Sequence, residues 1–297
     1  MTPSERRGVL WGLMAVAMFS LTLPATRRAV LEIDPGFLAI GRGIGAGLIS
    51  GLILWLTRQP MLCRRDLLVL CGVAAGVVIS FPYLTSLAMA GSSSSHGAIV
   101  VGLLPLSTAV AGVLLAGERP SFGFWIVSFA STALLAVFIL DGSQRSADAA
   151  DFALVGAVIS AAFGYALGGR LAIRLGGWQV ICWALMLALP VLGVSAMLVE
   201  WPRPAVTWPA WAGFAYVTLI SQLIGFFAWY HGLALGGIAR VSQIQLLQLF
   251  MTLAASAFLL GERIEPRMLA YGTAIIAMVA VGTRLRVGRN ANPEARS

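Results

Sequence analysis

The chain contains no lysine, and only 12 of its 297 residues are aspartate or glutamate. Charged residues make up 11% of the sequence, whereas 59% of it is hydrophobic and the mean hydropathy is +0.89. A folded chain of this length with so little charge cannot cover its surface with polar groups in water. The composition therefore excludes an ordinary soluble globule and predicts a protein surrounded by lipid.

Cysteine is also scarce: Cys63, Cys71 and Cys182 leave an odd count and show no Cys-x-x-Cys spacing. The two histidines, His96 and His231, lack metal-ligand spacing as well, so we expect no cofactor and no metal. An intramembrane enzyme would need a His-Glu-x-x-His motif, paired aspartates or a Ser/Lys dyad at membrane depth. None is present, so the sequence favours a protein that is not an enzyme.

The net charge of +8 would suggest nucleic-acid binding in a soluble protein. Here all twenty basic residues are arginine, and nearly all lie between apolar segments or near the C-terminus. This placement excludes a nucleic-acid partner and instead carries information on membrane topology. The partners we expect are the lipid bilayer and a small-molecule substrate, with the protein as a monomer or homodimer.

Ten apolar segments are long enough to cross a bilayer as helices, which takes roughly 20 residues each. The sequence predicts them at about 9–28, 37–56, 66–88, 95–116, 121–140, 152–172, 178–199, 208–231, 239–260 and 267–283. The links between them are short. The predicted fold is an all-α integral membrane protein with ten transmembrane helices around a central cavity.

Arginine placement predicts the orientation of these helices, because cytoplasmic loops of membrane proteins are enriched in basic residues. With a cytoplasmic N-terminus, thirteen arginines lie inside, namely Arg6, Arg7, Arg58, Arg64, Arg65, Arg119, Arg170, Arg174, Arg240, Arg284, Arg286, Arg289 and Arg296. Six lie outside, namely Arg27, Arg28, Arg145, Arg203, Arg263 and Arg267. We therefore expect a multi-pass protein of the bacterial inner membrane with both termini in the cytoplasm.

A constant offset of 144 residues superposes the two halves of the chain without a gap. It places Leu115-Ala116-Gly117-Glu118-Arg119 on Leu259-Leu260-Gly261-Glu262-Arg263, and Phe19 on Phe163. Each half holds five predicted spans, an odd number, so the second half must enter the membrane from the opposite side. Inverted repeats of this kind are typical of secondary transporters that work by alternating access around a site near the midplane.

These residues resemble the EamA-type family of the drug/metabolite transporter superfamily. The resemblance rests on the Pro-containing stretch from Leu104-Pro105-Leu106 to Gly117-Glu118-Arg119, and on Arg42 within Leu38-Ala39-Ile40-Gly41-Arg42. It implies one repeat at 8–141, a second at 152–285 and a cytoplasmic tail at 286–297. The second repeat departs from the family pattern because Leu249 stands where proline is common, which puts a symmetrical hinge role in doubt.

No aspartate or glutamate lies in the middle of a predicted span. Proton-coupled exporters of lipophilic cations rely on such a carboxylate. With that residue absent, the resemblance implies export or exchange of small metabolites, with amino acids and related neutral or zwitterionic compounds as the leading class. Efflux of purines, sugars or drugs is the alternative within transport, and a channel or membrane scaffold is the alternative outside it.

Arg42 is the one charged residue well inside a predicted span, where it could pair with a substrate carboxylate. Alternatively it extends to the membrane surface or binds helix-end carbonyls. Three prolines, Pro24, Pro82 and Pro105, leave the carbonyls of Ser20, Val78 and Val101 without a helical partner and are candidate hinges. An ordinary packed kink is the alternative for each of them.

Polar and aromatic residues gather on the third, fourth, eighth and ninth predicted spans. Ser242, Gln245 and Gln248 share one face of a helix, which suits a cavity wall or a contact with a neighbouring helix. Phe19 and Phe163, next to Ser20 and near Tyr165, could form a symmetric gate or simply pack in the core. The candidate substrate-binding residues are Phe19, Ser20, Arg42, Tyr83, Phe163, Tyr165, Tyr216, Gln222, Trp229, Gln245 and Gln248.

Overall fold

Helices account for nearly all of the fold, which we describe from a computed structural model. The structure describes residues 3–116, 119–120, 122–142, 149–202, 205–236, 241, 244–284 and 287–288. Helices of the first half are α1 (Pro3–Ser20), α2 (Thr22–Val30), α3 (Pro35–Leu56), α4 (Arg64–Val73), the π-helix η1 (Ala74–Ser80), α5 (Phe81–Gly91), α6 (Ser94–Val101), α7 (Leu104–Ala116) and α8 (Phe122–Gly142). Those of the second half are α9 (Ala149–Leu175), α10 (Gly177–Ser195), α11 (Trp208–Ala215), the π-helix η2 (Tyr216–Ile224), α12 (Gly225–Gly236), α14 (Leu246–Leu260) and α15 (Pro266–Arg284).

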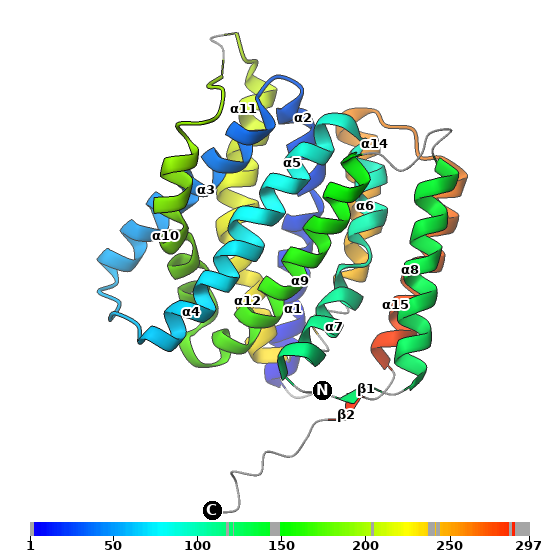
Figure 1. Ribbon diagram of the computed structural model, residues 1–297, viewed down its shortest axis with the longest axis horizontal. Helices are drawn as coiled ribbons and strands as arrows, with labels where there is room; N and C mark the ends of the chain where they lie inside the picture. Colours follow the sequence, from blue (N-terminus) through cyan, green and yellow to red (C-terminus); the bar gives the residue numbers. More distant parts are fainter. Residues whose placement is uncertain are drawn as a thin grey trace, which may run out of the picture.

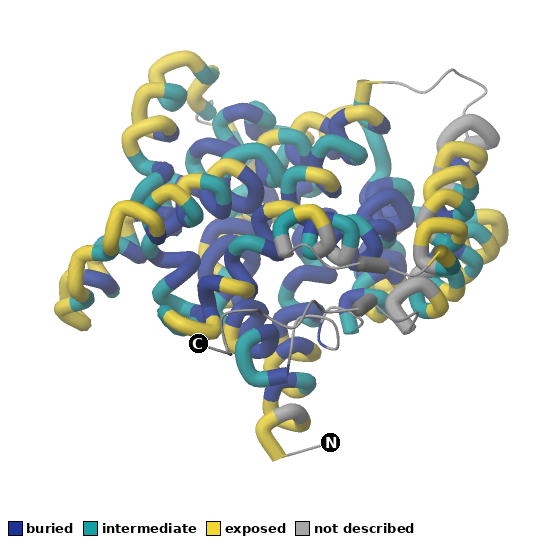
Figure 2. Tube along the Cα trace, turned by 60° about the horizontal axis from the view of Figure 1, so that its bottom comes forward, coloured by how far each residue is buried: buried dark blue, intermediate teal, exposed yellow. Residues whose placement is uncertain are grey.

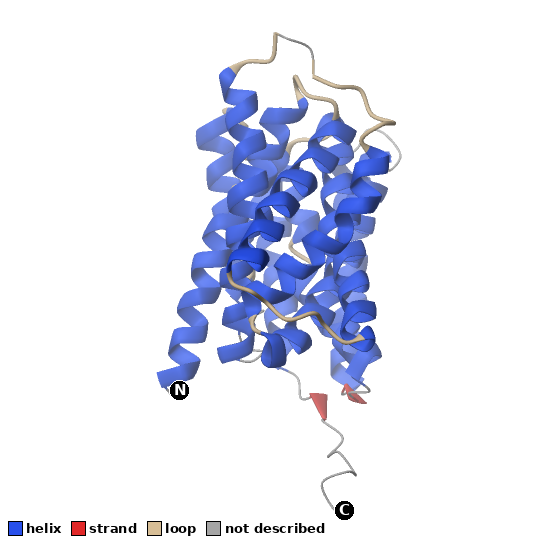
Figure 3. Ribbon diagram, turned by 90° about the vertical axis from the view of Figure 1, so that its left-hand side faces the viewer, coloured by secondary structure: helices blue, strands red, loops and turns tan. Residues whose placement is uncertain are grey.

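The helices lie side by side in one bundle, with connections at its two ends (Figure 3). Seven helical stretches among the described residues are long and apolar enough to cross a membrane, and α8 and α14 contain shorter apolar stretches. Together these helices make the chain a multi-pass membrane protein. The exact count of ten crossings stays a prediction. The three predicted spans not among these seven, at 121–140, 239–260 and 267–283, overlap with α8, α14 and α15 respectively.

The packing of the helices follows a two-fold relation between the halves. The first predicted span, α1 and α2, packs on the eighth, and the sixth span, α9, packs on the third. The second span packs on the seventh (α3 on α10), the fourth on the ninth (α6 on α14) and the fifth on the tenth (α8 on α15). An exchange of the two halves leaves this set of pairs unchanged, as a pair of equivalent repeats requires.

The halves also run in opposite directions. In Figure 1, α1 starts at the lower end of the bundle, whereas α9 runs from the upper end to the lower. At the lower end of the bundle, the short strand β1 (Arg119–Pro120), between α7 and α8, pairs antiparallel with β2 (Val287–Gly288), which follows α15. The buried residues occupy the centre of the bundle, and exposed ones lie along its outer helices (Figure 2). That exposed apolar rim is the surface expected to face lipid.

Glycines bring α1 and α12 into close contact. A Cβ atom at Gly8 would lie 2.4 Å from the backbone nitrogen of Gly236, and one at Gly232 would lie 2.9 Å from the backbone nitrogen of Gly12. Small residues at four-residue spacing on both helices allow this approach. The first and eighth spans, which belong to different repeats, are joined here backbone to backbone.

We therefore predict that Gly8→Ala lowers the thermal stability of the detergent-purified protein, by about 1–3 kcal/mol, because the added methyl group meets only backbone atoms. Gly193→Ala is the matched control, since a Cβ built at this helical glycine has no atom within 4 Å apart from the nearby backbone of its own helix. It should not lower stability, because alanine favours helix over glycine. Equal melting temperatures for the two variants would contradict the close packing of α1 on α12.

Candidate functional site

Three spans of the first half are irregular at the prolines predicted as hinges. The first span is interrupted at Leu21, between α1 and α2, where Pro24 offers no N–H to the Ser20 carbonyl. The fourth is interrupted between Val101 and Leu104, just before Pro105. Pro82 follows η1, and there the Phe81 N–H donates to Gly76, five residues back. Whether these points bend during a transport cycle stays a prediction.

The second half repeats two of these irregularities without the prolines. The 144-residue offset places η1 on residues 218–224 of η2, and the Val101 position on Gln245, where the ninth span makes a turn. The Gln248 N–H donates to the Gln245 carbonyl at 3.0 Å, three residues back, which is tighter than an α-helical bond. Leu249 replaces the proline, yet the backbone keeps the interruption. The packing of the two repeats, and not proline alone, determines where these helices break.

The two interruptions meet at a small polar cavity in the interior. Gln245, Gln248 and Thr252 of the ninth span line it together with Val101 and Gly102 of the fourth. Its volume is about 10 Å³, close to the smallest space that can hold a water molecule. Both amide atoms of Gln245 and the Oε1 of Gln248 are buried without a hydrogen-bond partner among the described residues. Unsatisfied buried amides are unfavourable, so these groups favour a polar partner such as water or a polar solute.

Arg42 lies inside the bundle, only 1% exposed. Its Nη2 donates to the Ser221 hydroxyl of η2 at 3.1 Å, and that hydroxyl is 2.9 Å from the Thr22 hydroxyl at the start of α2. Its Nε and Nη1 have no hydrogen-bond partner among the described residues. The side chain therefore does not extend to the membrane surface, and the alternative that it does is wrong.

Aromatic residues of the first, sixth and eighth spans form one buried cluster. The ring of Phe19 lies 5.2 Å from that of Phe226 and 6.2 Å from that of Trp229, and the Tyr165 ring lies 5.5 Å from Trp229. The Trp229 Nε1 has no partner among the described residues. Gln245 lies beside the Tyr165 hydroxyl but makes no hydrogen bond of normal geometry with it. The cluster thus adjoins the polar cavity.

Three further predicted residues make contacts within the helix bundle. The Gln222 amide donates to the Val77 carbonyl at 3.1 Å, which joins the two π-helices. The Tyr216 hydroxyl donates to the Met18 carbonyl at 2.8 Å. The Ser20 hydroxyl bonds to Ala17 within its own helix. The bonds of Gln222 and Tyr216 therefore join neighbouring spans around the site, whereas that of Ser20 stays within α1.

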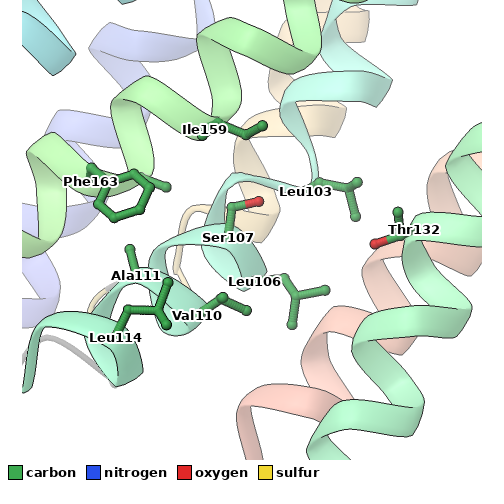
Figure 4. Close-up of a pocket in the computed structure, with 10 residues that line it drawn as sticks. Leu103, Leu106, Ser107, Val110, Ala111, Leu114, Thr132, Ile159 and Phe163 are labelled. Atoms are coloured by element: carbon green, nitrogen blue, oxygen red, sulfur yellow. The ribbon is translucent and has the colours of Figure 1, made fainter. Parts of the chain in front are cut away.

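Two predicted residues lie apart from this centre. Tyr83 is 42% exposed and makes none of the contacts described above. Phe163 is 37% exposed and lines an apolar pocket of about 180 Å³ between α7, α8 and α9, where it points toward the pocket beside Ile159 (Figure 4). Phe19 and Phe163 therefore lie in different surroundings. The structure does not pair them as a symmetric gate, and Tyr165 joins Phe19's cluster instead.

Glu262, the glutamate of the second Gly-Glu-Arg motif, has a role that was not predicted from the sequence. Its carboxylate accepts hydrogen bonds from the backbone N–H groups of Ser94 and Ser95, both at 2.9 Å, and from their hydroxyls. It thus caps the N-terminus of α6 from the other repeat. The motif itself was the available signal, but sequence cannot show which helix it caps. Glu118, its counterpart, lies outside the described residues, as do Ser242 and the tail at 289–297.

Burial raises the pKa of the Glu262 carboxyl, but the hydrogen bonds from Ser95 and Ser94 outweigh it and hold this pKa below its ordinary value of 4.5.

A nearby pair joins His96 of α6 to Asp151 of α9, with 2.7 Å between Nε2 and Oδ1. At the opposite end of the bundle, Arg174 binds Asp66 and Arg170 donates to the Leu115 carbonyl at 2.8 Å. Polar contacts between helices therefore fasten both ends of the bundle.

Comparisons with known proteins agree with this geometry. The family model described as the EamA-like transporter family matches residues 6–140 and again residues 148–283. The "Uncharacterized transporter YdeK" of Bacillus subtilis (strain 168) is 45% identical over 278 residues, which cover 93% of this chain and 97% of that protein. A solved crystal structure that is 19% identical matches with a TM-score of 0.63, over 93% of this chain and 97% of its own; it supports the fold alone.

For Glu262→Gln we predict lower thermal stability at neutral pH, by about 1 kcal/mol, because a neutral amide caps the helix less well than a carboxylate. The pKa of Glu262 is lowered in the folded state. The carboxylate's contribution to the free energy of unfolding is therefore present above pH 4.5 and is lost as the pH falls through the pKa of the folded protein. The variant should therefore lose less stability than the wild type between pH 6 and pH 3, roughly the range over which a lowered carboxyl pKa acts.

Melting curves across that pH range, in detergent or nanodiscs, test this prediction. Glu200→Gln, in an exposed loop, is the control and should follow the wild type. Parallel pH profiles for Glu262→Gln and the wild type would show that the cap contributes nothing.

Proposed function

Because the chain belongs to the EamA-like transporter family, we propose that it is a secondary transporter that exports or exchanges small metabolites by alternating access. Its proposed substrates are amino acids and related neutral or zwitterionic compounds. The proposal places the protein in the bacterial inner membrane with both termini in the cytoplasm. It assigns no enzymatic step and no cofactor.

One observation carries the proposal: interrupted spans from the two repeats meet at the cavity of Gln245, Gln248 and Thr252. In transporters built from inverted repeats, discontinuous helices at the repeat interface form the substrate site, because unwound backbone and polar side chains can bind solute there. The two-fold packing of the helices supplies two related arrangements of similar energy. Movement of one repeat against the other would then open the cavity to either side in turn.

The substrate class is supported by what surrounds this cavity. No aspartate or glutamate lies in the middle of a predicted span, so a lipophilic cation would find no carboxylate there. Amide and hydroxyl groups of Gln245, Gln248 and Thr252 can donate and accept hydrogen bonds. The aromatic cluster of Phe19, Tyr165, Phe226 and Trp229 lies next to them. This combination suits a small polar or zwitterionic solute with an apolar side chain.

Counterflow into proteoliposomes tests the proposal. Vesicles preloaded with one of a panel of amino acids, nucleosides, sugars and organic acids should take up the same labelled compound faster than protein-free vesicles. Growth of expressing cells on toxic analogues narrows the panel beforehand. Absence of counterflow for every compound, together with single-channel conductance in planar bilayers, would replace the transporter with a channel.

We predict that Gln248→Leu lowers counterflow at least about tenfold, because a buried hydrogen-bonding group that the solute needs is lost. Gln59→Leu, on the loop between α3 and α4, is the matched control and should transport as the wild type does. Both variants should elute as single species in size-exclusion chromatography. Wild-type counterflow by a folded Gln248→Leu variant would remove this cavity from the transport path.

A further inference from the structure

A positive charge without a counter-charge is buried beside the first, second and eighth spans. Arg42 is 1% exposed, and none of the ion pairs found among the described residues includes it. Its one hydrogen bond among the described residues is to the neutral hydroxyl of Ser221. A guanidinium cannot lose its charge in a protein, so this residue stays cationic wherever it lies. Burial of such an unpaired charge is strongly unfavourable.

The contacts orient the guanidinium and leave part of it free. Ser221 accepts from Nη2 while it also contacts Thr22, so side chains from two other spans, one from each repeat, hold one edge of the group. The free donors are those of Nε and Nη1. The Thr26 hydroxyl, one turn beyond Thr22 on α2, is also buried without a partner among the described residues. The free Nε and Nη1 donors of this buried cation would be stabilised by an acceptor.

We propose that Arg42 binds the carboxylate of the transported solute through its Nε and Nη1 groups. This inference rests on the proposed transport function and names the chemical group that the site selects. Arginine suits a carboxylate because its planar N–H groups match the two oxygens. A monoanionic group balances the single charge, whereas a dianionic phosphate would remain half compensated, because Thr22 and Ser221 are neutral.

The surroundings also suit the rest of a zwitterionic solute. The Ser20 carbonyl, which Pro24 leaves without its helical donor, lies two residues before Thr22 and is an acceptor for an ammonium group. Leu23, the neighbour of Thr22, lines the cavity that contains Gln245 and Gln248. The arginine cluster and the polar cavity are therefore adjacent along the first span.

The same arrangement gives binding a role in the transport cycle. Arg42 belongs to the first repeat and Ser221 to the second, so a shift of η2 against α3 alters the contact between them. A bound carboxylate neutralises the charge in the closed conformation. The empty transporter keeps it uncompensated, and this difference favours closure with solute bound.

Competition by matched compounds tests the carboxylate requirement. Counterflow of the labelled substrate identified by the screen is measured in the presence of one competitor at a time. The competitors form three pairs of a carboxylate and its amide: L-leucine and L-leucinamide, L-phenylalanine and L-phenylalaninamide, and benzoate and benzamide. For the wild type, each carboxylate should inhibit at least about tenfold more strongly than its amide, as expected when a site's buried charge would otherwise remain unpaired. The measured quantity is the ratio of the two inhibition constants, which does not depend on the amount of active protein.

Arg42→Gln should bring this ratio close to one in protein that still elutes as a single species. Arg42→Lys should lower it about fivefold, because lysine keeps the charge but not the paired donors. Arg58→Gln, on the loop after α3, is the control and should leave it unchanged. A merely structural role would lower activity without changing the ratio. If Arg42→Gln does not fold, the ratio for Arg42→Lys decides the question.

Two outcomes separate this inference from the proposed function. Transport of solutes by the wild type with equal inhibition by acids and amides, or a wild-type ratio in Arg42→Lys, overturns the carboxylate site and leaves the transporter in place. Absence of counterflow for the whole panel overturns the proposed function itself. A high ratio in the wild type that falls in both Arg42 variants supports the inference.

Discussion

Satisfaction of backbone hydrogen bonds in lipid is the constraint on which this structure depends. A peptide group that faces hydrocarbon must bond within its own helix, so an interruption is tolerated only where protein or a wet cavity covers it. The breaks at Leu21, between Val101 and Leu104, and at Gln245 accordingly lie in the interior of the bundle. By contrast, α3 and α8 run without a break. The helix α10 is also continuous, even though it contains Pro190. The same rule that shapes the helices therefore concentrates the irregular backbone at the candidate site.

The relation between the repeats is the second organising feature. Gly8 and Gly232 join the first and eighth spans at the lower end, whereas Glu262 joins the ninth span to the start of the fourth at the upper end. Both contacts link one repeat to the other. The glycine contact is close packing of backbone atoms, whereas the carboxylate cap consists of charge-assisted hydrogen bonds.

The fold could be predicted well from the sequence, and the site only in part. Hydropathy and the 144-residue offset gave the helices and the repeat, because both are local or periodic properties of the chain. Phe19, Arg42, Gln245 and Trp229 were found as candidates because polar or aromatic residues within apolar spans stand out. Their partners could not be found in this way: nothing in the sequence pairs Arg42 with Ser221, or Glu262 with Ser94 and Ser95, since these contacts join distant spans. Tyr83 and Phe163 are aromatic like Phe19 and Trp229, but their side chains are partly exposed and lie outside the central aromatic cluster.

The sequence by itself determined that this chain is an integral membrane protein with two related helical halves, because charge, hydropathy and repetition follow from residue order alone. It also located Pro24, Pro82 and Pro105, whose missing N–H is a property of the residue. Only the tertiary structure decided that the second half breaks at Gln245 without a proline, that Arg42 is buried with free donors, and that the fourth and ninth spans enclose a polar cavity. These features depend on which helix faces which, and that choice is made by packing between residues far apart in the chain.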